Sequence, residues 1–531
     1  MFQVLTCVRR PLSPRRAPPA GAAVGAQPVP VRVTAAVRGA LLRTLCPLGL
    51  LLLWACQASA TQAAHAADPR IRSVESGLLP ITATRTRLGR YANIRDRMRA
   101  YGVAGLSVAV IEGGRVAWAK GYGVADARVG SAVTTATLFQ AASISKPLAA
   151  LGALALVERG KLDLDADVNQ YLLAWKVPAN AFTASRPVTL RTLLDHSAGL
   201  ADDGFDNYAP GQALPTLAQV LQQHASAIHV DFVPGSQHRY SNTGYVVLQQ
   251  LMVDASGEPF DAYLHAQVLT PLGMAHSTFQ PAPAAGRASG HYAGGAPVAG
   301  GYRVGPELAV AGLWTTPAEL ARYVIKVQQW YAGTTGGVIT PALARQMLTP
   351  QIAYAGLGVV LSGRGTNTRF GHDGFNTGFE ASMVGYVHGG KGAVVMANSG
   401  FAYMLIKEVL GSIARAYHWP DYASTNQWPP SASITQQEVV PLPRAVLSAA
   451  VGRYALDANT VIRIFARDQR LFLDWPGDGE AEIFHTPDGR LFCPQLTFSE
   501  LGDPFLRYTP GAQGAITELL ADDGQVVLRR T

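Results

Sequence analysis

Ser143 and Lys146 stand three residues apart in the stretch Ser143-Ile-Ser-Lys146, a spacing that puts both side chains on one face of a helix. Serine is a weak nucleophile until a neighbouring base takes its proton, and a lysine desolvated by burial can act as that base. Pro147 is tolerated only in the first turn of a helix, so Ser143 is predicted at the helix start. Backbone N–H groups there could stabilise a developing oxyanion. Taken alone, the pair fits a lysine on a solvated helix face better.

A second polar group, Tyr240-Ser-Asn242, follows the turn at Pro234-Gly235. A tyrosine beside a lysine can move a proton to a leaving group, and an asparagine can orient both a lysine and a substrate amide by hydrogen bonds. In isolation, a loop tyrosine with a turn-forming asparagine explains these residues equally well.

The third group is Gly371-His-Asp-Gly374, followed by Phe375. Paired glycines let a backbone approach a ligand closely, and His372 offers a neutral donor or a switchable charge. A lone histidine is more often structural. The order and spacing of the three groups together, rather than any one of them, point to a common site.

Predicted strands come before the first of these groups and after the last one. Residues 106–111 and 116–120 are predicted strands around a tight turn, and residues 381–387 and 393–397 are predicted strands around a second turn. Residues 143–158 are a predicted helix that stops at Gly160. We therefore predict an α+β fold, an antiparallel sheet flanked by helices with a helical subdomain, whose sheet closes from both chain ends.

The last part of the chain changes character. Residues 419–444 are rich in Pro, Ser and Gln and are predicted to form a linker. Short alternating runs separated by turn residues then predict a small antiparallel β-barrel or sandwich over 445–531, with strands at 461–465, 471–475, 482–485, 491–493, 505–508, 516–520 and 526–528. The other predicted parts are a leader over 1–60, an N-terminal extension over 61–85 and the main domain over 86–418.

The distribution of charge points to export. The 531 residues carry a formal net charge of +8, which invites a nucleic-acid or anionic-membrane partner. Residues 1–60 hold seven arginines and no acid, and the remainder holds 37 bases against 36 acids. An apolar run from Leu45 to Cys56, flanked by arginines and followed by Ala58-Ser59-Ala60, is typical of a signal peptide cleaved before Thr61.

This leader predicts a periplasmic or secreted protein. A lipid anchor at Cys56 is the weaker alternative, because the bulky Trp54 stands just before the small residue that precedes the cysteine. Cleavage after Ala60 leaves Cys493 as the one remaining cysteine, so neither an internal disulfide nor a cysteine zinc site is predicted. No later run of 18 apolar residues predicts a membrane span.

Two other patterns do not predict a binding site. Gly385 to Lys391 matches a phosphate-binding loop, but Gly392 stands where a Ser or Thr should hold magnesium, and the segment joins two predicted strands. His224, His229 and His238 lack metal-ligand spacing. We predict no metal, no cofactor and no nucleic-acid partner.

Taken in order, the three polar groups resemble the serine β-lactamase and penicillin-binding protein superfamily, in particular its class C-like branch, which pairs S-x-x-K with Y-x-N and K-T-G or H-x-G. The resemblance covers about residues 86–418. Further stretches support it, namely residues 104–111, 189–200, 271–274 and 311–317. The tail beyond residue 445 more loosely resembles the lipocalin-like barrel appended to some peptidases and esterases of this group.

The resemblance implies roles for individual residues. Ser143 resembles the acylated nucleophile, Lys146 and Tyr240 the proton-transfer pair, and Asn242 a substrate-positioning residue. His372 and Gly374 would also position substrate, and the backbone N–H groups of Ser143 and Phe375 would form the oxyanion hole. Whether lysine or tyrosine is the base stays open.

His372 departs from the β-lactamase pattern, which usually has lysine there. A mostly neutral histidine holds a substrate carboxylate less well at pH 7. We therefore predict an exported serine hydrolase that acts on a small-molecule or peptide ester or amide, as a carboxylesterase, D-peptidase or β-lactamase, with β-lactam hydrolysis in doubt. The alternative is a silent binder of cell-wall peptide or β-lactam. The barrel could mediate oligomers.

Overall fold

A computed structural model describes residues 68–201, 205, 207–223, 228–422, 436–455, 461–475, 479–494, 505–510, 514–520 and 526–531. Every described residue belongs to one compact unit, residues 65–531. The predicted leader over 1–60, with its cleavage site and Cys56, lies outside the described residues, as do residues 423–435 of the predicted linker.

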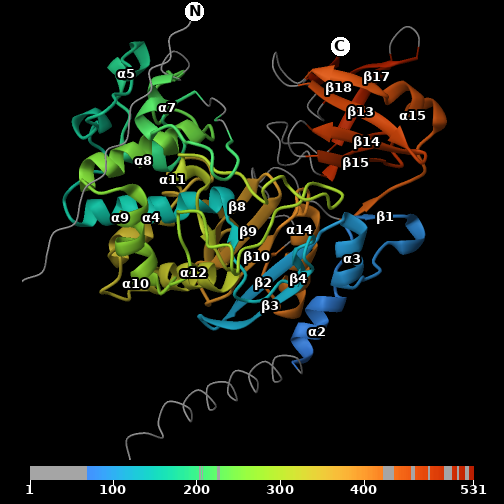
Figure 1. The fold of residues 1–531 in the computed structure, drawn as a ribbon, viewed down its shortest axis with the longest axis horizontal. Coiled ribbons are helices and arrows are strands. Elements are labelled where there is room, and N and C mark those ends of the chain that lie inside the picture. The colour runs from blue at the N-terminus through green and yellow to red at the C-terminus, as the bar shows by residue number, and fades with distance from the viewer. Residues whose placement is uncertain are drawn as a thin grey trace, which may run out of the picture. The chain divides into compact units, whose positions relative to one another are not determined.

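A seven-stranded antiparallel sheet forms the centre of the main domain, in the order β4-β3-β2-β10-β9-β8-β7 (Figure 1). Its strands are β2 Gly105–Glu112, β3 Arg115–Asp126, β4 Ser131–Ala132, β7 Val360–Ser362, β8 Arg369–Asn376, β9 Phe379–Tyr386 and β10 Gly392–Ala397. Because β10 pairs with β2, the sheet closes from both chain ends, and the predicted α+β class is confirmed.

Helices cover both faces of this sheet, so its central strands read as continuous apolar runs rather than as alternating ones. Val108 and Val110 of β2 pack with α14 (Tyr403–Ala416), α2 (Pro69–Ser76) and α3 (Ile94–Tyr101). Ala109 and Ile111 point to the opposite face and pack with α12 (Pro317–Tyr331) in the larger core. Successive residues of one strand thus serve two separate cores.

The larger core continues into the helical region around α4 (Ser145–Glu158) and α8 (Asn242–Ser256). Every α4 residue from Ser145 to Leu156 is buried, so this helix is covered on all sides. The predicted stop holds: Gly160 has φ +66°, and the N–H of Lys161 donates to the carbonyl of Leu156 at 2.9 Å.

Shorter elements complete this domain. The remaining helices are α5 Ala181–Ser185, α6 Leu190–Leu194, α7 Leu217–Gln223, α9 Phe260–Leu264, α10 Thr270–Leu272, α11 Leu308–Ala311 and α13 Pro341–Met347. Single turns are η1 Arg85–Arg87, η2 Ala142–Ile144, η3 Val168–Gln170, η4 His265–Leu269 and η5 Gly365–Asn367. Strand β5 (Phe139–Gln140) pairs with β6 (Trp314–Thr315).

The C-terminal region is a closed antiparallel barrel, as predicted (Figure 1). Its strands are β12 Gly452–Ala455, β13 Val461–Arg467, β14 Arg470–Trp475, β15 Gly479–His485, β16 Leu491–Phe492, β17 Phe505–Pro510, β18 Ile516–Leu520 and β19 Val526–Arg530. Strand β12 is additional to the predicted seven. Cys493 is an unbridged cysteine buried in the barrel core.

The predicted linker contains regular structure that its composition did not signal. Strand β11 (Gln437–Glu438) pairs in parallel with β1 (Thr82–Ala83). Helix α15 begins at Arg444 and ends at Ala450, just before the barrel.

The segment Gly385–Lys391, which matches a phosphate-binding loop in sequence, leads from β9 into β10. These two strands are antiparallel, and Gly385 of β9 pairs with Gly392 of β10.

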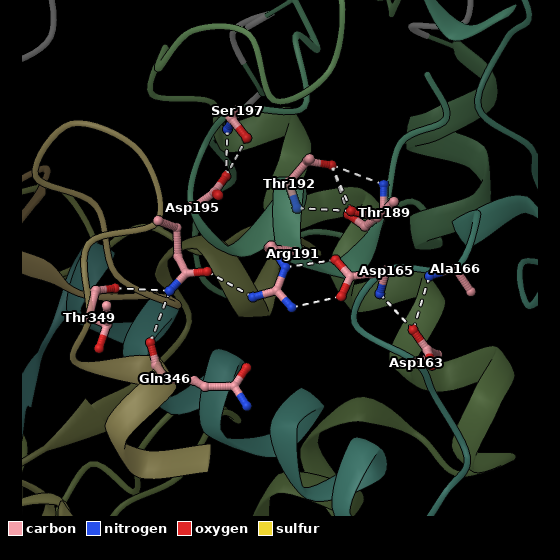
Figure 2. Close-up of polar contacts among 11 residues, drawn as sticks. Asp163, Asp165, Ala166, Thr189, Arg191, Thr192, Asp195, Ser197, Gln346 and Thr349 are labelled. Atoms are coloured by element: carbon pink, nitrogen blue, oxygen red, sulfur yellow. Dashed lines mark hydrogen bonds and ion pairs between the residues drawn. The ribbon is translucent and has the colours of Figure 1, made fainter. Parts of the chain in front are cut away.

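Helix α6 is fixed by the polar contacts drawn in Figure 2. Thr189 and Thr192 form a reciprocal capping box at its start. Arg191 forms an ion pair of 2.7 Å with Asp165 and donates to Gln351 at 2.7 Å. These contacts tie the short helix to two other segments of the chain, so the residues that follow it are held in place.

Asp195, which ends α6, generates a prediction about stability and pH. Burial raises the pKa of its carboxyl from 3.8 to about 6, against the opposing hydrogen bonds from Ser197. The folded chain therefore binds this proton more tightly than the unfolded chain. As pH rises from 3.8 to about 6, the free energy of unfolding falls. Asp195→Asn should raise the free energy of unfolding at pH 8 by roughly 1–3 kcal/mol, with little change at pH 4.

Urea unfolding at the two pH values measures this difference. Asp165→Asn is the control of opposite sign, because the Arg191 hydrogen bond lowers the pKa of Asp165. That variant should not gain stability at pH 8. An equal gain in both variants, or a loss at pH 8 in Asp195→Asn, would contradict the prediction.

Candidate active site

Ser143 lies in η2, a turn held in an unusual conformation just before α4. Ala142 has φ +48°, in the left-handed region that non-glycine residues seldom adopt. The Ser145 hydroxyl donates to the carbonyl of Ala142 at 2.6 Å and accepts the N–H of Leu313 at 2.9 Å. The N–H of Ala141 donates to the carbonyl of Leu313 at 2.8 Å. The turn is thus clamped from outside, which balances its strain.

Lys146, the second residue of α4, is fully buried and reaches back to this serine. Its Nζ lies 3.0 Å from Ser143 Oγ and 3.2 Å from the carbonyl oxygen of Val310. Val310 belongs to α11, so the same segment that clamps the turn through Leu313 also binds the lysine. Lys146 is therefore fixed at the serine by the spacing of α4 and by a contact from a distant segment.

Tyr240 approaches the serine from the start of α8. Its Oη lies 3.2 Å from Ser143 Oγ, and its ring lies 5.0 Å from Lys146 Nζ. Ser241 caps the helix by accepting the N–H of Gly244 at 3.0 Å. Asn242 is the first residue of α8. The structure thus brings the hydroxyl groups of Ser143 and Tyr240 and the Nζ atom of Lys146 to one point.

Strand β8 brings His372 and Gly374 to the same turn. A Cβ atom on Gly374 would lie 2.2 Å from the carbonyl oxygen of Ala141, so only glycine lets the strand approach η2 this closely. Phe375, the next residue, is 38% exposed, and its ring centroid lies 5.6 Å from that of Tyr403. The backbone of the Gly371–Gly374 group therefore runs directly beside Ser143.

His372 is buried and neutral. Its Nδ1 lies 2.6 Å from the carbonyl oxygen of Asp373 and therefore carries the proton, which leaves Nε2 as the acceptor. Burial, together with the nearby charge of Lys146, lowers the pKa of the imidazole to about 4. At neutral pH this position thus supplies a polar but uncharged group.

Two features near these side chains were not singled out from the sequence. Asp373 points to the opposite face of β8, where its carboxylate binds the buried Lys407 at 3.2 Å and Tyr403 at 3.1 Å, both from α14. A lysine within the apolar run of residues 403–410 was a signal for such a buried pair. His196 stacks on Tyr240 with ring centroids 4.4 Å apart.

Within the described ranges, no group of three or more His, Cys, Asp or Glu side chains is arranged to hold a metal ion. In the same part of the chain, no helix has the length and apolar character needed to cross a bilayer.

The fold and this arrangement define a class, the serine hydrolases that place a lysine and a tyrosine at the nucleophile. Residues 91–407 match the family model described as Beta-lactamase, which is more than half of the chain. The chain therefore belongs to the beta-lactamase family, within the serine β-lactamase and penicillin-binding protein superfamily.

Individual relatives agree with this assignment. Penicillin-binding protein 4* of Bacillus subtilis is 24% identical over 450 residues, covering 79% of this chain and 93% of that protein. Esterase EstB of Burkholderia gladioli is 33% identical over 188 residues, 33% of this chain and 47% of the esterase. The octameric penicillin-binding protein homologue from Pyrococcus abyssi shares the fold, with a TM-score of 0.55 and 21% identity over 82% of this chain and 97% of its own.

The close approach at Gly374 predicts a local cost of substitution. Gly374→Ala forces the added methyl against the Ala141 carbonyl and should lower the free energy of unfolding by about 1–3 kcal/mol. Gly244→Ala, near the start of α8, is the matched control, because its Cβ would meet nothing closer than 3.7 Å. In urea unfolding, equal stabilities of the two variants would show that β8 and η2 are not in contact as described.

Proposed function

We propose that this chain is a class C-like serine hydrolase that works through a covalent acyl-enzyme on Ser143. The observation that carries the proposal is the convergence on one hydroxyl: Lys146 Nζ at 3.0 Å and Tyr240 Oη at 3.2 Å from Ser143 Oγ. Both distances are within hydrogen-bond reach, which is what transfer of the serine proton requires.

In this mechanism Ser143 Oγ attacks the carbonyl carbon of an ester or amide while its proton passes to Lys146 or Tyr240. The N–H groups of Ser143 and Phe375 stabilise the oxyanion, and removal of one such donor typically costs about 2.7–4 kcal/mol of the barrier. The same proton then protonates the leaving alcohol or amine. Water, deprotonated by the same pair, attacks the acyl-enzyme, the bond between Ser143 Oγ and the acyl carbon breaks, and the pair returns that proton to Oγ as the acid leaves.

The substrate class follows from the neutral His372 together with the relatives. An uncharged imidazole binds a substrate carboxylate less strongly than a lysine would. We therefore place esters and D-amino-acid peptides or amides ahead of β-lactams. Among relatives, one is named an esterase and another a putative D-alanyl-D-alanine carboxypeptidase, and a D-amino acid amidase shares the fold with a TM-score of 0.52 and 22% identity. Asn242 and Gly374 would position these substrates.

Export belongs to the same proposal. The arginine-flanked apolar run and the Ala58-Ser59-Ala60 site favour a periplasmic or secreted enzyme, and Cys56 leaves a lipid anchor as the alternative. The barrel would shape the cleft or mediate oligomers. Mass analysis of the protein isolated from its own cells distinguishes a chain beginning at Thr61 from one lipidated at Cys56.

Replacement of the nucleophile tests the central claim. Ser143→Ala should abolish both hydrolysis of a p-nitrophenyl ester and labelling by a fluorophosphonate probe, because no oxygen remains to be acylated. Ser236→Ala, an exposed serine four residues before Tyr240, should leave both unchanged. Labelling that persists in Ser143→Ala would refute the assignment, and labelling of the wild type without turnover would favour the silent binder.

Exchange of the histidine tests the substrate preference. His372→Lys places a fixed positive charge at the site, so the ratio of kcat/KM for a chromogenic cephalosporin to that for an uncharged ester should rise by about tenfold or more. His372→Gln is the neutral control and should not raise the ratio. A ratio that is unchanged in His372→Lys would show that charge at this position does not select the substrate.

A further inference from the structure

His196 contacts three consecutive residues of the chain that carries Tyr240. Its carbonyl oxygen accepts the N–H of Arg239 at 2.9 Å. Its imidazole stacks on the Tyr240 ring at 4.4 Å between centroids, with 30° between the planes. Its Nδ1 accepts the N–H of Ser241 at 3.2 Å. One residue thus binds a segment 43 to 45 positions further along by backbone, ring face and ring nitrogen together.

The position of His196 is itself fixed. It follows α6, which the capping box and the Arg191–Asp165 pair hold in place (Figure 2). The Asp195 carboxylate accepts both the N–H and the hydroxyl of Ser197, which closes the turn around His196. On its other side the imidazole lies 5.1 Å from the Tyr245 ring, and only 6% of the residue is exposed.

The chemistry of the contact requires a neutral imidazole. A nitrogen that accepts the Ser241 N–H carries a lone pair, so the ring proton must be on Nε2. Burial, with the nearby charge of Lys146, keeps the pKa of His196 well below its usual range. The acceptor therefore persists at neutral pH.

The contacts from His196 matter because the Tyr240 hydroxyl must stay within hydrogen-bond reach of Ser143 Oγ. Its hydroxyl stands at the far end of a ring that pivots about the side-chain torsions, and a misplacement of about 1 Å can cost a hundredfold in rate. His196 restrains both the ring face and the backbone on either side of it. Ser241 also caps α8, so the same contact sets where that helix and Asn242 begin.

We propose that His196 is a positioning residue that holds Tyr240 Oη in reach of Ser143 Oγ. This inference rests on the proposed function and adds to it the group on which the geometry of the proton-transfer pair depends. His196 acts through Tyr240 and does not touch the reacting atoms.

Three substitutions separate its contacts. His196→Asn keeps an acceptor near the place of Nδ1 and tolerates the left-handed backbone of this residue, φ +59°, but loses the ring. His196→Phe keeps the ring and loses the acceptor. His196→Ala loses both. We expect the single-turnover acylation rate with a p-nitrophenyl ester to fall about tenfold in the Asn and Phe variants and about a hundredfold in Ala, with KM within about twofold.

A double-mutant cycle with Tyr240→Phe identifies the route of the effect. If His196 acts through the Tyr240 hydroxyl, His196→Phe should slow acylation in the wild type and have no further effect in the Tyr240→Phe background. Losses that multiply in the double variant, or a wild-type acylation rate in all three His196 variants, would overturn the proposal.

A buried histidine elsewhere controls for stability. His291 is fully buried and binds the carbonyl of Asn398 through Nδ1 at 2.9 Å. His291→Asn should lower the thermal midpoint as much as the His196 variants do, while the acylation rate stays within about twofold. If it slows acylation equally, His196 is only structural. If the fluorophosphonate probe does not label Ser143 in the wild-type protein, the proposed function itself is refuted.

Discussion

The site depends on one close backbone contact, that between the turn before α4 and strand β8. Ala141 and Gly374 are 233 positions apart in the chain, yet a single added methyl group would overlap there. This contact fixes where the serine stands relative to the strand that carries His372 and Phe375. The left-handed Ala142 lies in the turn that β8 approaches, and Gly374 lets the strand come this close to it.

The surrounding structure holds this contact from several sides. Helix α4 is buried around its whole circumference, so it cannot tilt without disturbing the larger core. The segment Val310–Leu313 binds Lys146 through one carbonyl and the turn through the backbone of Leu313. Strand β8 lies between β7 and β9 in the sheet. Packing and hydrogen bonds thus place three elements that are distant in sequence around one hydroxyl.

The sequence predicted the parts of this structure that local rules determine. The helix limits near Pro147 and Gly160, the apolar strands β2, β9 and β10 and the alternating barrel strands all follow from side-chain pattern. Strand β8 did not, because its glycines and charged residues disfavour strands and only its two neighbours in the sheet hold it extended. Strand β11 depends likewise on a partner more than 350 residues away.

The site residues also divide into those that local sequence patterns predict and those that only tertiary contacts reveal. Ser143 and Lys146 were found by helical spacing, and Tyr240 and His372 by their order and by resemblance. His196 lies in the stretch 189–200 that supports the resemblance, but no local pattern marks its role, because that role depends on a stacking contact with a residue 44 positions away. Tertiary packing alone creates that relation.

Electrostatics near Lys146 follow from the alternation of a β-strand. Successive side chains of β8 point to opposite faces, so His372 lies on the Tyr240 side, with ring centroids 6.2 Å apart, while Asp373 faces α14. Lys407 binds that carboxylate on the far face at 3.2 Å. A carboxylate beside Lys146 would favour its protonated form, which cannot accept a proton from serine. The strand instead presents a neutral imidazole to the lysine, and His196 is a second one behind Tyr240. The residue order His-Asp-Gly therefore separates charge: it places the acid in a buried pair with Lys407 and leaves an uncharged polar group on the other face of β8.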